Sequence, residues 1–149
     1  MRDLIHNLAF NLCLAPTFVK QSTHSQSLDC QGFDSITFVS TFGEGSEAPS
    51  ELRNVSLTCQ WSQDKQTWGT AKQEDILGLK VDEAGTLFVY DHADKANTIK
   101  CWGYCGPGRY VRVQLAVTGE WNQGVPLSIL MIGGHAHHAP AHRTQGGSV

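Results

Sequence analysis

The stretch that decides the fold is YVRVQLAVT, residues 110–118. Its apolar side chains occupy every second position, at Val111, Val113, Leu115 and Val117. Because successive side chains of a strand point to opposite sides, this period of two predicts a strand with one face in a core. The intervening positions, such as Arg112 and Gln114, are expected to face outward.

The same alternation recurs along the chain and indicates an all-β protein. In residues 35–42, Ile36, Phe38, Ser40 and Phe42 face one way and Ser35, Thr37, Val39 and Thr41 the other. Further strands are expected at 55–62, 86–90, 98–104 and 126–132, and the 61–68 stretch reads as a hairpin. Only residues 72–79 hint at a short helix. Many short strands separated by glycine-rich turns predict a single antiparallel β-sandwich of jelly-roll type, with an up-and-down barrel as second choice.

The chain has 149 residues, a length that fits one domain. We expect an N-terminal arm at 1–26, a sandwich at 27–132 and a C-terminal arm rich in His and Gly at 133–149. In the first arm, Leu4, Ile5, Leu8 and Leu12 suit a helical stripe, whereas Phe10, Leu12 and Leu14 suit an extended segment. The sequence leaves these two alternatives open.

Charge and cysteine content exclude several classes of protein. Lys plus Arg is 11 and Asp plus Glu is 14, a formal net charge of −3, which argues against nucleic acid as a partner. No apolar run approaches the roughly 20 residues of a membrane-spanning helix, and the N-terminus is a poor signal peptide. Five cysteines on unrelated spacings are read as mostly reduced, buried thiols of a chain that folds in a cytoplasm.

No motif predicts catalysis, a metal or a cofactor. The histidine run between His135 and His142 lacks a rigid surrounding shell, so we interpret it as a polar arm. Cys101 and Cys105 are roughly 13 Å apart on an extended strand, too far to share one ion without a bend. Acidic residues such as Asp91 and Asp94 fall in expected loops, and no nucleophile has an activating base nearby in sequence. We therefore expect a protein that is not an enzyme.

Tryptophans suggest a contact surface. Trp61 shares the parity of Leu57 and Cys59 and is expected in the core, whereas Trp121 lies in a polar stretch and is expected at an exposed loop tip. Exposed aromatic side chains anchor many protein contacts. They also stack on sugar rings, which leaves a lectin-like carbohydrate-binding module as an alternative of another class.

Several short segments follow one another in order along nearly the whole chain. They are MRDL at 1–4, DCQGFDSITF at 29–38, QWSQD at 60–64 with Trp68, RYVRV at 109–113 and the ending from Gly134-His135 to Pro140. Together they resemble small β-sandwich proteins on the capsid exterior of tailed phages, prophages and gene-transfer particles. Residues 71–105, with Cys101 and Cys105, depart from that pattern.

The resemblance implies a structural virion protein that is made in the host cytoplasm and decorates or cements the capsid exterior. Its partners would be the major capsid protein and further copies of itself, as a trimer, or as a pentamer at a vertex that carries a head spike or fibre. Extended ends reach neighbours through strand addition or groove filling. The expected contact residues are Leu4, Ile5, Leu8, Phe10, Leu12, Trp121, His135, His137 and Pro140.

Overall fold

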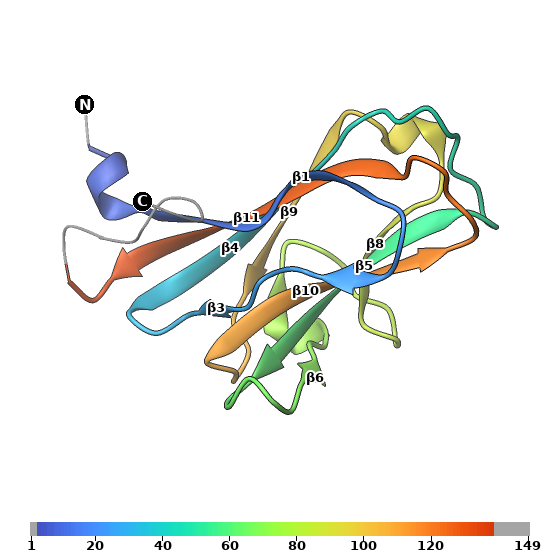
Figure 1. Ribbon diagram of the computed structural model, residues 1–149. Helices are drawn as coiled ribbons and strands as arrows, with labels where there is room; N and C mark the ends of the chain where they lie inside the picture. Colours follow the sequence, from blue (N-terminus) through green and yellow to red (C-terminus); the bar gives the residue numbers. More distant parts are fainter. Residues whose placement is uncertain (1–2, 139–149) are drawn as a thin grey trace.

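The computed structural model describes residues 3–138 and shows two antiparallel sheets packed face to face (Figure 1). The predicted β-sandwich is confirmed. No α-helix occurs in residues 3–138; there are three single 3₁₀ turns, η1 (Ile5–Asn7), η2 (Gln73–Asp75) and η3 (Ala93–Lys95). The helix suggested at 72–79 is therefore only the short η2 turn.

The first sheet, sheet A, has five strands in the order β1-β11-β4-β9-β7. Their bounds are β1 (Ala9–Val19), β11 (Val125–Ala136), β4 (Phe33–Phe42), β9 (Thr98–Tyr104) and β7 (Ile76–Leu77). The long central pair β4 and β11 keeps one uninterrupted register, from Leu127 opposite Phe42 to Ala136 opposite Phe33. This unbroken pairing aligns the side chains of neighbouring strands in rows across the sheet.

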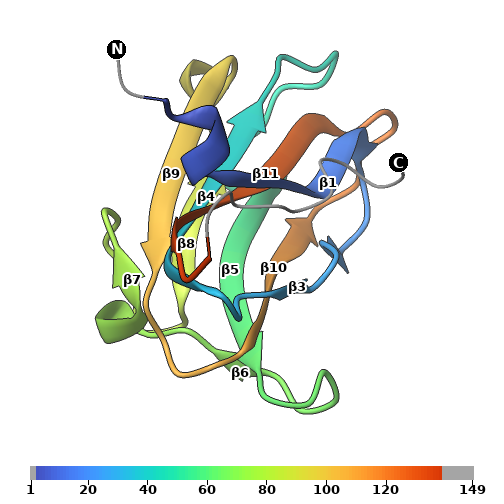
Figure 2. The ribbon, with the colours of Figure 1, turned by 90° about the vertical axis from the view of Figure 1, so that its left-hand side faces the viewer.

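The second sheet, sheet B, has six strands around the pair β10 and β5. β10 (Tyr110–Thr118) pairs along its whole length with β5 (Asn54–Ser62). The short strands β2 (Thr23–His24) and β3 (Leu28–Asp29) flank β10, and β6 (Gly69–Thr70) and β8 (Thr86–Tyr90) flank β5 (Figure 2). The predicted hairpin is confirmed, because Trp61 of β5 lies opposite Gly69 of β6.

Inward side chains of both sheets form one core. Phe38 of β4 stacks on Trp102 of β9 at 5.5 Å between ring centroids. From sheet B, the alternating positions of β10 and β5 are fully buried, and they are Val111, Val113, Leu115, Val55, Leu57 and Cys59. The alternation in residues 110–118 thus correctly predicts which side of β10 faces the core.

Both terminal segments contribute strands to sheet A. Residues 9–19 are the edge strand β1, which pairs with β11, and residues 133–136 are the end of β11 itself. Part of each segment expected to be an arm therefore belongs to the sandwich. The end of the C-terminal segment, with Pro140, lies outside the described residues.

The edge strand β1 is irregular. Its register shifts twice, between Leu12 and Leu14 and between Leu14 and Thr17. Pro16 lies within the second shift, and the backbone amide of Gln26 donates to the Cys13 carbonyl at 2.9 Å. These irregularities explain why residues 1–26 give no single period in the sequence.

Candidate functional site

The outward positions of sheet A form an apolar surface. Register places Leu12, Leu130, Val39 and Cys101 in one row across four strands, and Phe10, Ile132 and Thr37 in the next row. Ile99 lies opposite Thr41, whose hydroxyl bonds that of Ser128 at 2.6 Å. We call this surface the apolar face; with Leu77 of β7 it comprises Phe10, Leu12, Thr37, Val39, Thr41, Leu77, Ile99, Cys101, Ser128, Leu130 and Ile132.

Solvent reaches several large side chains of the apolar face. Ile99 is 58% exposed and Leu77 is 59% exposed. The apolar face, which includes the row of Phe10 and Ile132, contains no charged side chain. Contiguous exposed apolar surface is uncommon on a soluble protein and marks a site of interaction.

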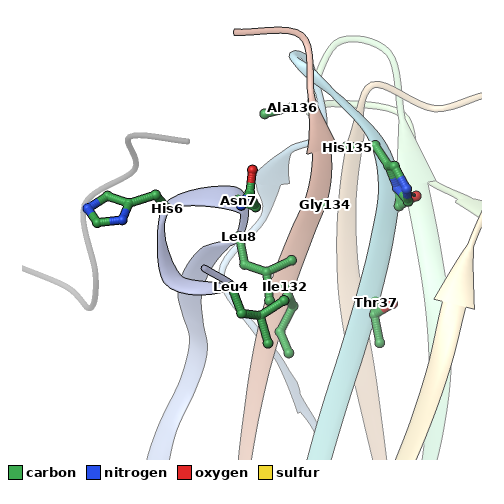
Figure 3. Close-up of a pocket in the computed structure, with 10 residues that line it drawn as sticks. Leu4, His6, Asn7, Leu8, Thr37, Ile132, Gly134, His135 and Ala136 are labelled. Carbon is green, nitrogen blue, oxygen red and sulfur yellow. Dashed lines mark hydrogen bonds between the residues drawn. The ribbon is translucent and has the colours of Figure 1, made fainter. Parts of the chain in front are cut away.

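A groove of about 500 Å³ extends the apolar face at one end of sheet A. The η1 turn lies beside the end of β11, and Figure 3 shows Leu4 and Leu8 gathered against Ile132, with the His6 ring turned away from them. The rim carries polar groups, since the Ser35 hydroxyl bonds Nδ1 of His135 at 2.6 Å. The groove can take an apolar side chain with a polar end.

Of the nine expected contact residues, six lie on or beside this one surface, including His135 at the groove rim. Leu4 and Leu8 line the groove, and Phe10 and Leu12 belong to the apolar face. Ile5 is 56% exposed on η1. The structure therefore brings the apolar residues of the N-terminal segment together. Phe10, Leu12 and Leu14 lie on the extended strand β1, so the extended alternative is confirmed, whereas the helical stripe is wrong because only the single 3₁₀ turn η1 precedes β1.

His135 and His137 fasten the end of β11 to the start of β4. Nε2 of His137 lies 2.7 Å from Oδ1 of Asp34, and its backbone amide donates to the Gly32 carbonyl at 3.0 Å. His135 lies on the groove rim and takes a left-handed backbone conformation, with φ of 50°. Among residues 3–138 no group of three or more His, Cys, Asp or Glu side chains is arranged to hold a metal ion.

The prediction that Trp121 is an exposed contact residue is wrong, because Trp121 is only 7% exposed. The Glu47 carboxylate accepts the backbone amides of Asn122, Gln123 and Gly124, at 2.7, 2.6 and 3.0 Å. These bonds fold the loop back, and the Arg53 guanidinium lies 5.2 Å from the Trp121 ring centre. The polar neighbours of Trp121 suggested exposure, whereas Glu47, far away in the sequence, buries it.

Backbone donors also change the acid–base behaviour of Glu47. The three amides, above all that of Asn122, and then nearby Arg53 lower the pKa of the Glu47 carboxyl below its usual value of 4.5. The Arg53 guanidinium is 3.7 Å away. Glu47 is thus a structural carboxylate, with both of its oxygens bound by backbone amides.

The loop carboxylates considered in the sequence also have structural partners. The Lys95 ammonium lies 2.6 Å from Oδ1 of Asp91, and this bond is the main cause of the lowered pKa of Asp91. The His92 ring accepts the backbone amide of Asp94 at 3.2 Å and so caps the η3 turn.

No described helix is long and apolar enough to cross a membrane.

Five residues of the apolar face were not predicted from the sequence as contact residues: Val39, Leu77, Ile99, Leu130 and Ile132. One signal was available in VPLSILMI, residues 125–132, where apolar residues occupy both parities. A strand with one solvated face alternates, whereas a strand covered on both sides reads as a continuous apolar run. Leu127, Ile129 and Met131 are buried in the core, so Leu130 and Ile132 are the apolar residues left over for the outside.

The site is therefore an open apolar surface with a groove at one end. An apolar centre with a polar rim is typical of a protein interface. A comparison of the chain with family models, curated proteins and solved structures finds no match.

Proposed function

We propose that this chain is a structural protein without enzymatic activity on the outside of a tailed-phage head, where it binds and stabilises the capsid as a symmetric oligomer. The observation that carries the proposal is the uncharged apolar face of sheet A. The resemblance of the sequence to head-exterior sandwiches names the partner, which is the major capsid protein.

The chemistry of the apolar face suits permanent attachment. Removing apolar surface from water stabilises a complex by roughly 25 cal/mol per Å² before the costs of association are subtracted. Because the face carries no charge, docking leaves no buried unpaired ion on this side. An oligomer that contacts the lattice through several copies binds far more tightly than one copy does.

The N-terminal segment supports the same orientation. Leu4, Ile5 and Leu8 lie next to the apolar face, so residues before β1 extend the surface that would meet the capsid. Removing residues 1–26 would also remove β1 and damage sheet A. Removing residues 1–7 takes away η1 and leaves every strand in place.

The proposal is tested by sedimentation with purified heads of the phage that encodes the chain. We expect the wild-type protein to pellet with the heads, and Ile99→Glu to weaken binding about tenfold or more, because a charge would be buried without a partner. Leu52→Glu is the matched control. Leu52 is 84% exposed outside sheet A, so the same charge there should leave binding unchanged.

Deletion of residues 1–7 should weaken sedimentation less than Ile99→Glu does. A wild-type protein that stays in the supernatant would contradict the proposed function, and equal binding by Ile99→Glu would contradict the assigned face. The mass of the purified oligomer separates a cementing trimer from a pentameric vertex base for a spike or fibre.

A further inference from the structure

The outward side of sheet B differs from the apolar face and presents a single arginine surrounded by amides and hydroxyls. Arg112 of β10 lies opposite Gln60 of β5, and Gln114 lies opposite Thr58. We call this surface the polar face, and it comprises Ser56, Thr58, Gln60, Arg112 and Gln114. All five side chains are partly exposed.

Arg112 is held in place by neutral groups. Its guanidinium carbon lies 4.0 Å from the centre of the Trp68 ring, and its Nε donates to Oε1 of Gln60 at 2.8 Å. Among the described residues no carboxylate lies within ion-pair distance of it, and its two terminal nitrogens make no hydrogen bond. Burial without a counter-charge lowers the pKa of Arg112, which nevertheless stays charged.

A second arginine, three residues earlier in the chain, shows which partner a guanidinium accepts. Arg109, just before β10, uses Nε and Nη2 to bind both oxygens of Asp29, at 3.1 and 2.9 Å. A carboxylate that accepts two parallel hydrogen bonds in this way is the preferred partner of a guanidinium group. At Arg112, Nε is bound to Gln60 but the two terminal nitrogens are free. Within the described residues, Arg109 therefore has a carboxylate partner and Arg112 has none.

We propose that the polar face binds an acidic carbohydrate, with the carboxylate of a uronic-acid type sugar on the terminal nitrogens of Arg112. The amide of Gln114 and the hydroxyl of Thr58 lie alongside to bond sugar hydroxyls. This inference does not depend on the proposed capsid function, since it uses the opposite side of the sandwich.

The balance of charge favours a sugar over a polyanion. Lys65 lies 4.7 Å above the Tyr110 ring, and Arg109 is neutralised by Asp29. Lys65 carries a second charge beside the face, but the polar face itself contains one cation, Arg112, on a chain of net charge −3. Nucleic acid requires many phosphate contacts, whereas one carboxylate among several hydroxyls matches one cation among neutral donors and acceptors.

The test is a ligand-observed NMR titration with three probes: tetragalacturonate, its methyl ester, and tetraglutamate. Tetragalacturonate should bind the wild-type protein. Its methyl ester should bind about tenfold more weakly or worse, because a hydrogen bond to a charged group is lost. Tetraglutamate carries carboxylates without sugar hydroxyls and should bind more weakly than tetragalacturonate.

Three variants identify the residue. Arg112→Gln should weaken binding of tetragalacturonate about tenfold or more, and Arg112→Lys should fall between, since it keeps the charge but not the fork. Lys20→Gln removes the same charge from an exposed position next to β1 and should bind normally. Arg112→Lys carries the test if Arg112→Gln does not fold.

Four results would overturn the proposal. They are no saturable binding of tetragalacturonate, equal binding of its methyl ester, unchanged binding by both Arg112 variants, and binding of tetraglutamate as tight as that of tetragalacturonate. The last result would assign the polar face to an acidic peptide instead.

Discussion

On sheet A the outward positions of β4 and β11 hold Val39, Leu130 and Ile132, whereas on sheet B the outward positions of β5 and β10 hold Thr58, Gln60 and Arg112. The inward positions of the same strands are apolar on both sheets except for Ser40 of β4, whose buried hydroxyl donates to the Lys100 carbonyl at 3.1 Å. Inward side chains therefore build a similar core from both sides, and the outward side chains make the two faces differ. In each of these strands, one set of alternate residues determines the fold and the other set determines the chemistry of the surface.

The largest expected effect separates the inside of β4 from its outside. Phe38→Ala should cost about 3–5 kcal/mol of unfolding free energy, because Phe38 is fully buried and stacked on Trp102. Val39→Ala and Thr58→Ala, at half-buried outward positions of the two sheets, should each cost about 1 kcal/mol or less. Urea denaturation measures all three.

If Val39→Ala proved as costly as Phe38→Ala, the apolar face would be a second core and not a docking surface. In that case the two sheets would differ in how much their outward side chains stabilise the fold. Equal small costs at Val39 and Thr58 would instead show that the apolar character of sheet A is not needed for folding.

The next effect concerns acid. Glu47 has a lowered pKa, so its stabilising bonds are complete above its usual value of 4.5 and are lost as the pH falls through the lower value of the folded state. These bonds hold Gly124, the residue directly before β11, whereas β10 ends at Thr118, before the first residue whose amide Glu47 binds. We expect hydrogen-exchange protection, corrected for the intrinsic exchange rate at each pH, to fall in β11 before β10 when the pH is lowered from 7 to well below 4.5.

Glu47→Gln should weaken the protein at pH 7 and flatten this dependence on pH, because an amide cannot offer two charged oxygens to three donors. Identical exchange in β11 and β10 at every pH would show that Glu47 does not anchor sheet A selectively.

The smallest effect reports directly on the apolar face. Cys101 is exposed there, whereas Cys13 and Cys59 are buried in the core, and burial raises the pKa of Cys13 to about 12 and also raises that of Cys59. Because the thiolate is the reactive form, iodoacetamide should label Cys101 and leave the two core thiols untouched in the folded protein. Mass spectrometry of the peptides locates the label.

Binding to heads should slow the labelling of Cys101 severalfold if the apolar face is the attached side. Unchanged labelling in the pellet would direct attention to the other surfaces of the sandwich. The expectation of mostly buried thiols is wrong, because Cys13 and Cys59 are buried, Cys30 is half-buried, and Cys101 and Cys105 are exposed.

Long strands were predictable because one physical rule, alternation against a core, governs them. The expected strand at 110–118 and the strand at 98–104 agree with the structure at both ends. Two-residue strands such as β7 and β3 have no periodicity to detect, and they exist only because β9 and β10 lie next to them. The strand β1 was hidden by Pro16 and by shifts that change its parity.

The candidate site was predictable in part. Leu4, Leu8, Phe10 and Leu12 could be singled out because large apolar residues stand in a segment outside the expected core. Their neighbours Val39 and Ile99 could not, because their exposure depends on which sheet lies behind them. Trp121 was misjudged because its burial depends on Glu47, a contact between distant parts of the chain.

The irregular edge of β1 has a consequence for how copies of this protein meet. An open strand edge beside an apolar face is a template for fibre growth, in which sheets of successive molecules join end to end. Pro16 has no amide hydrogen to donate at that edge, and the Cys13 carbonyl is already taken by Gln26. Molecules of this kind can coat a surface side by side without polymerising through their sheets.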